Sequence, residues 1–155
     1  MSLFLALLLA AGFGAFVVLG VAYAVRTPIW QNPDEPAHFN YVAFVAQTGG
    51  LPVLDQGDWD SDLLELVKNG QLERVDQIRY EDWQPPLFYL LAAPLLRAGP
   101  PADVYAAVLR LRLLDVAFGA LTLGVGWLAA REVFSKDDVL LAGATPLVMA
   151  VQADN

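Results

Sequence analysis

The feature that most constrains this fold is an apolar run near the N-terminus, Leu3–Val25, which contains no charged residue. A helix rises about 1.5 Å per residue, so the run is long enough for a hydrocarbon core of roughly 30 Å. A cleaved signal peptide is the alternative, since "AYA" at Ala22–Ala24 resembles a cleavage site. Lys and Arg are absent before the run, and a signal-peptide core usually has about 7–15 residues. The pattern therefore favours a first membrane span.

Composition extends this interpretation to the whole chain. Hydrophobic residues make up 57% of the sequence, against about 45–50% in a typical soluble domain. We expect an all-α polytopic membrane protein with three transmembrane helices, at 3–25, 109–130 and 139–155. The last span closes on "VLLAGATPLVMAVQADN", which favours the N-terminal part of a longer protein. The apolar segment 86–98 is too short to span and predicts an interfacial or re-entrant helix.

The long loop 26–108 between the first two predicted spans is acidic over most of its length. Eleven Asp and Glu face four Lys and Arg between Arg26 and Pro85, which argues against a nucleic-acid partner. Interfacial helices are expected near 35–48, 60–69 and 86–98. Asp34 is a candidate N-cap of the first of these helices, and Gly49 a stop signal. Phe39, Val42, Ala43 and Ala46 recur on one face, which predicts a helix lying along the membrane surface.

Charge gives an opposing indication of sidedness. Arg26, Arg97, Arg110 and Arg112 flank the long loop, whereas the short loop after the second span carries only Arg131 and Lys136. The positive-inside rule, taken alone, would place the long loop in the cytoplasm. If Arg110 and Arg112 serve function and not topology, the long loop can be extracytoplasmic.

The stretch "NPDEPAHFNYV" concentrates polar groups directly after the first span. Asp34 and Glu35 are adjacent, so on a helix they point about 100° apart and cannot form a matched acid/base pair. One of them can face a reaction centre while the other caps the helix or holds a metal. Helix capping explains Asp34, but it does not explain His38 beside the pair.

These segments resemble the opening of the C-type glycosyltransferases, polytopic enzymes that use polyprenyl-phosphate sugars. The likeness rests on "NPDEPAHFNYV", on "QPPLFYLLAAPLL" and on "VLRLRLLDVAFGALTLGVGWLAAREVF". The dolichyl-phosphate-mannose protein mannosyltransferases and the bacterial lipid A aminoarabinose transferases are the most similar groups, and a group of bacterial membrane proteins opening on "PDEPAHF" looks similar too. In the mannosyltransferases the histidine stands one residue nearer the acid pair than His38 does here.

The resemblance implies sugar transfer from a polyprenyl-phosphate donor on the extracytoplasmic side of a bacterial inner membrane, to an acceptor that the sequence does not identify. Asp34 would act as base or position the acceptor, with Glu35 beside it. Such a reaction needs a carboxylate to take the proton of the attacking group and cations to stabilise the departing phosphate. Arg110 and Arg112 are candidates for the cations, against ordinary snorkelling. The remaining candidate substrate-binding residues are His38, Tyr89 and Asp154.

Other interpretations stay open. His38 and Glu35 share a helical face and could hold a divalent metal, but they make an incomplete set of ligands. The chain could instead be a non-enzymatic membrane protein whose acidic loop binds cations or a partner. A third interpretation is a piece of a transporter with Asp115 inside the bilayer, although an ion pair with Arg112 is the simpler explanation of that carboxylate.

Overall fold

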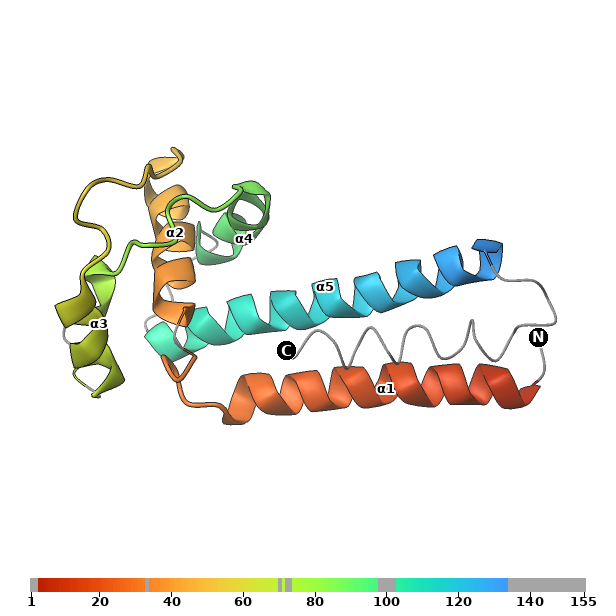
Figure 1. Cartoon of the computed structure of the whole chain (residues 1–155). Helices are drawn as coiled ribbons and strands as arrows, with labels where there is room; N and C mark the ends of the chain where they lie inside the picture. Colours follow the sequence, from red (N-terminus) through yellow and green to blue (C-terminus); the bar gives the residue numbers. More distant parts are fainter. Residues whose placement is uncertain (1–2, 33, 70, 72–73, 98–102, 134–155) are drawn as a thin grey trace. The chain divides into compact units, whose positions relative to one another are not determined.

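A computed structural model describes the chain except for residues 1–2, 33, 70, 72–73, 98–102 and 134–155. Every regular element in the described part is helical, which confirms the all-α class. The elements are α1 (Leu3–Arg26), α2 (Glu35–Thr48), α3 (Ser61–Lys68), the short 3-10 helix η1 (Val75–Gln77), α4 (Leu87–Arg97) and α5 (Val104–Val133). They are labelled along the ribbon in Figure 1, except for η1.

Two helices are long and apolar enough to cross a membrane, Leu7–Arg26 within α1 and Val104–Val133, which is α5. The second begins at Val104 and not at residue 109, because "VYAAVLRLR" continues the helical pattern without a break. The predicted third span, 139–155, lies outside the described residues.

The chain divides into two compact units. Unit 1 contains Met1–Arg26 and Arg112–Asn155, and unit 2 contains Thr27–Leu111. The helix α5 contributes its first turns to unit 2 and the rest to unit 1.

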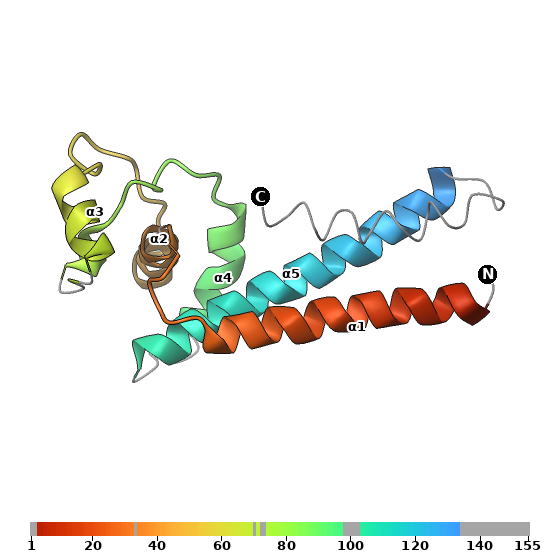
Figure 2. The ribbon, with the colours of Figure 1, turned by 60° about the horizontal axis from the view of Figure 1, so that its bottom comes forward.

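Unit 1 is an antiparallel pair of helices. The residues that meet occur in opposite order along α1 and α5. Ala24 pairs with Arg112, Gly20 with Val116, and Phe16 with Gly119. The two helices accordingly lie side by side in Figures 1 and 2. Small residues allow this approach: a Cβ on Gly20 would meet the Val116 side chain at 3.1 Å, and one on Gly119 would meet the Phe16 ring at 2.5 Å. Glycine at these positions lets two apolar helices pack closely.

Unit 2 is built around α2. Its start follows the expected signals, since Pro36 occupies the first turn, and Gly49 ends it in the left-handed conformation at φ 73° with its N–H bonded to the Val45 carbonyl. That conformation favours glycine because it carries no Cβ. The helix packs against α4 and η1.

The core of unit 2 has two parts. One cluster joins Ala37 of α2 to Leu63 of α3 and to Ile78 and Tyr80 after η1. The other is the face of α2 that meets α4, where the rings of Tyr41 and Tyr89 stack at 3.6 Å. Val42, which the sequence places on a membrane-facing side of this helix, is fully buried inside unit 2. The expectation was wrong on this point because the surrounding protein covers that position.

Candidate functional site

Asp34 stands at the N-cap position of α2, but its side chain does not cap the helix. The residue adopts helical angles (φ −93°, ψ −11°) and makes no side-chain cap hydrogen bond, whereas an effective cap has extended angles. Its Oδ1 accepts a hydrogen bond of 2.8 Å from the Tyr80 hydroxyl. The capping interpretation was therefore right about position and wrong about the side chain.

Tyr80, the donor of this hydrogen bond, is a buried residue. Only 8% of Tyr80 is exposed, and its ring makes an edge contact with Trp59 at 5.2 Å between centroids. Burial, together with the hydrogen bond to Asp34 and the charges of Asp34 and Glu81, raises the pKa of the phenol. The hydroxyl therefore keeps its proton and donates a hydrogen bond to Asp34. Asp34 itself is exposed to solvent, and no hydrogen bond to its second carboxylate oxygen is found among the described residues.

Glu35 turns to a different partner, as two adjacent carboxylates on a helix must. Its Oε2 accepts a hydrogen bond of 2.8 Å from the backbone N–H of Trp30. Trp30 has a φ of 65°, a conformation that is uncommon for a large side chain. Its ring makes an edge contact with Phe39 at 5.3 Å. Glu35 thus fixes the loop that joins α1 to α2, and this bond explains the carboxylate without catalysis.

His38 and Tyr89, both predicted to bind substrate, lie together. His38 Nδ1 is 2.8 Å from the Tyr89 hydroxyl. Tyr89 is only 3% exposed, so it is a core residue and not an interfacial aromatic. Burial, with the charges of Glu81, Tyr41 and Asp82, raises the pKa of this phenol. Tyr89 therefore stays protonated and can donate to Nδ1, which leaves Nε2 of His38 for another partner.

Asn40, which belongs to the same stretch "NPDEPAHFNYV", has a structural role. Its Nδ2 donates to the carbonyls of Val75, at 2.7 Å, and of Ile78, at 2.9 Å. Val75 is the first residue of η1 and Ile78 follows its last residue; the sequence analysis did not predict this element. One side chain of α2 therefore holds the backbone from which Tyr80 reaches Asp34.

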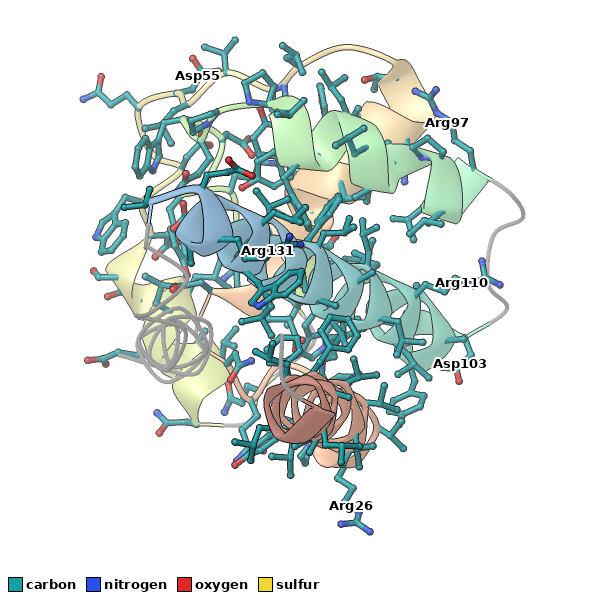
Figure 3. The ribbon with its side chains drawn as sticks, turned by 90° about the vertical axis from the view of Figure 1, so that its right-hand side faces the viewer. Arg26, Asp55, Arg97, Asp103, Arg110 and Arg131 are labelled. Carbon is teal, nitrogen blue, oxygen red and sulfur yellow. The ribbon has the colours of Figure 1, made fainter. Side chains whose placement is uncertain are left out.

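Two arginines of unit 2 donate hydrogen bonds to backbone carbonyls at the ends of other helices. Arg97 bonds to Val45 and Ala46 at the end of α2, and Figure 3 shows it at the end of α4. Arg110 bonds to Leu95 in the last turn of α4 at 3.2 Å.

Arg112 repeats this arrangement on α1, where it donates to Ala24 in the last turn at 3.0 Å. The last four carbonyls of a helix have no partner within the helix, and cations are favourable there. Capping of this kind explains both Arg110 and Arg112 without a leaving phosphate. Arg110 makes no described contact with Asp34 although both lie in unit 2.

Two predicted groupings stay predictions. Arg112 belongs to unit 1 and Asp34 to unit 2, so a shared site of the two is an expectation from the sequence. Asp154 lies outside the described residues.

Sequence reasoning missed Asp82, the most deeply buried carboxylate described. It is 6% exposed, and no hydrogen bond to its carboxylate is found among the described residues. Burial raises its pKa to about 6, Arg79 opposes the shift, and Asp58 adds to it. The sequence shows only an acidic pair, Glu81-Asp82, before Trp83. Nothing in that pattern tells which carboxylate turns inward.

A metal site receives little support from the described residues. They contain no group of three or more His, Cys, Asp or Glu side chains placed to hold an ion. Glu35 and His38 each bond to a protein group instead, Trp30 and Tyr89 respectively.

Comparison of the chain with known protein families, with characterised proteins and with solved structures yields no significant match. What the site does must therefore be argued from its own chemistry.

Proposed function

We propose that this chain forms part of a membrane glycosyltransferase that moves a sugar from a polyprenyl-phosphate donor to an acceptor. Asp34 is its general base. The observation that carries the proposal is the state of the Asp34 side chain, which is exposed, does not cap the helix, and is held through one oxygen by Tyr80. A carboxylate with a fixed orientation and a free oxygen suits proton abstraction.

The position of Asp34 along the chain supports a lipid-borne substrate. Seven residues lie between it and Arg26, the last residue of a helix long enough to span a membrane. At most about 3.6 Å per residue can separate the two, so Asp34 lies within roughly 29 Å of the end of that helix. A polyprenyl-phosphate sugar carries its anomeric carbon at the membrane surface, which a residue so close to the end of a span can approach.

In the proposed reaction a hydroxyl or amine of the acceptor attacks the anomeric carbon and forms the new glycosidic bond. The bond from that carbon to the phosphate oxygen breaks, and polyprenyl phosphate leaves with the electron pair. Asp34 takes the proton of the attacking group. Attack from the face opposite the phosphate inverts the anomeric centre. Stabilisation of the leaving phosphate by Arg110 and Arg112 is part of the proposal, and it requires each to do this besides capping a helix.

The test uses membranes that contain the protein and radiolabelled polyprenyl-phosphate mannose or aminoarabinose as the probes. Asp34→Asn should lower sugar transfer by a factor of about 10²–10⁴, the usual contribution of a general base. Asp55→Asn, at an exposed carboxylate of the same unit, is the control and should retain transfer. Unchanged transfer by Asp34→Asn at normal expression would eliminate Asp34 as the base.

The second candidate is a non-enzymatic membrane protein with an acidic loop that binds a partner. The observation that favours it is the acidic surface of unit 2, where Asp55, Asp62, Glu65 and Asp76 are all exposed. Absence of transfer by the wild-type protein with either donor would favour this second function.

A further inference from the structure

The helix α4 exposes an apolar stripe on one side. Leu87, Leu90, Leu91 and Pro94 are all exposed, and their spacing of three and four residues places them on one helical face. The opposite face is buried in unit 2 through Tyr89, Ala92 and Ala93. The helix has no charged residue before its last position, Arg97. A soluble surface rarely shows such a stripe without a partner for it.

Exposed carboxylates lie across α2 from the apolar stripe of α4. Figures 1 and 2 both show α3 on one side of α2 and α4 on the other. The helix α3 carries exposed Asp62 and Glu65. These carboxylates require water, whereas the stripe of α4 does not.

Chain connectivity indicates what covers the apolar side. Unit 2 begins at Thr27, directly after Arg26 ends α1, and it ends at Leu111, inside α5. Both connections are therefore made to helices long and apolar enough to cross a membrane. Because unit 2 is joined in sequence to both helices, at Thr27 and within α5, it stays next to the surface of a bilayer that these helices span. Trp83, which is exposed just before α4, has the amphipathic ring typical of that depth.

We propose that the stripe of α4 inserts into the boundary between headgroups and acyl chains, while the α3 side faces water. Amphipathic helices at this boundary bury their apolar face about 5–10 Å deep. The inference rests on α1 and α5 spanning the bilayer, and it does not depend on glycosyl transfer. It keeps the lipid contact that the sequence pattern predicted for segment 86–98, which is α4, and does not extend it to the face of α2 that contains the buried Val42.

The experiment uses the absence of cysteine from the sequence. Single cysteines at Leu90, at Asp62 and at Val18 carry a nitroxide spin label, in protein reconstituted into phosphatidylcholine vesicles. All three side chains are exposed, so the label displaces little packing. Collision rates with oxygen, which concentrates in lipid, and with a water-soluble nickel chelate give the depth of each label. Position 18, in α1, is the lipid reference, and position 62, in α3, is the water reference.

The expected result is an oxygen-to-nickel ratio at position 90 several times that at position 62, and below that at position 18. A ratio at position 90 equal to that at position 62 would overturn the docking of α4, while lipid exposure at position 18 would leave the spanning of α1 intact. Water exposure at all three positions would overturn both. Dipolar broadening at position 90 with little oxygen access would show that a second copy covers the stripe, which also overturns the proposal.

Discussion

Each unit is stabilised internally by a different kind of interaction. In unit 1 the contacts between α1 and α5 are apolar and close, made where Gly20 and Gly119 leave room for Val116 and Phe16. In unit 2, hydrogen bonds from Asn40, Tyr80, Arg97 and Arg110 tie the segments together around a small core. Unit 1 also turns apolar residues outward, among them Val18, Leu121 and Val125. A pair of helices with apolar surfaces inside and out suits lipid, in which close packing and not hydrophobic burial drives association.

The arginines, by contrast, play the same part in both units. Arg97, Arg110 and Arg112 each donate to the last turn of another helix, whichever unit they occupy. Three of the four arginines that flank the long loop therefore donate to the ends of α2, α4 and α1. Charge that serves capping says less about sidedness than the positive-inside rule assumes.

The largest effect should come from breaking the polar contacts of unit 2 at Asn40. Asn40→Leu removes the side-chain donor to the Val75 and Ile78 carbonyls. The Val75 carbonyl keeps the backbone N–H of Ile78, so the main cost is the loss of the donor to the Ile78 carbonyl, about 1–3 kcal/mol in a buried setting. Amide hydrogen exchange over residues 75–80 should speed up by the corresponding factor. Asn69→Leu is the matched control, because the bonds described for Asn69 are made by its backbone. Unchanged hydrogen exchange in Asn40→Leu would show that η1 is stable without the hydrogen bonds from Asn40.

The next largest effect should come from disturbing the close packing of α1 and α5 in unit 1. The ideal Cβ of Gly20 lies 3.7 Å from the Val116 Cβ, a separation that a disulfide accepts. Gly20→Cys with Val116→Cys should therefore cross-link on oxidation. Adding Gly119→Leu should reduce the yield strongly, because the side chain collides with Phe16, and overpacking costs about 1–3 kcal/mol.

Gly124→Leu is the control for this cross-link, since nothing lies within 4 Å of a Cβ at Gly124. Equal yields from Gly119→Leu and Gly124→Leu would contradict close packing at Phe16.

The smallest effect is a gain in stability, at Asp82. Its pKa is raised to about 6 in the folded protein, so the folded state binds a proton that an unfolded chain, with a pKa of about 3.9, has already lost. Stability therefore falls as the pH rises between these two values, and the full penalty is present above pH 6. Asp82→Asn removes it and should stabilise unit 2 by about 1–3 kcal/mol at pH 7.5, and by little at pH 4.

Thermal unfolding at the two pH values measures this difference, with Glu65→Gln on the exposed side of α3 as the control. A destabilising Asp82→Asn would mean that the charged form of Asp82 is needed for folding.

The sequence by itself determined the helices. The uncharged run in α1, the proline at the start of α2 and the glycine at its end act locally, so α2 occupies the predicted range of 35–48. The ranges predicted near 60–69 and 86–98 likewise contain α3 and α4. Such signals depend on chain geometry and on residues a few positions apart.

Only the tertiary structure decided what the polar side chains do. Asp34 bonds to Tyr80, His38 to Tyr89 and Arg97 to Val45, pairs separated by 46, 51 and 52 residues. Likewise, Asp82 turns inward while Asp62 stays in solvent, although both are aspartates in acidic surroundings of the sequence. A local pattern cannot encode these outcomes, because the partner and the local dielectric of a polar group are set by segments that meet only in the folded chain.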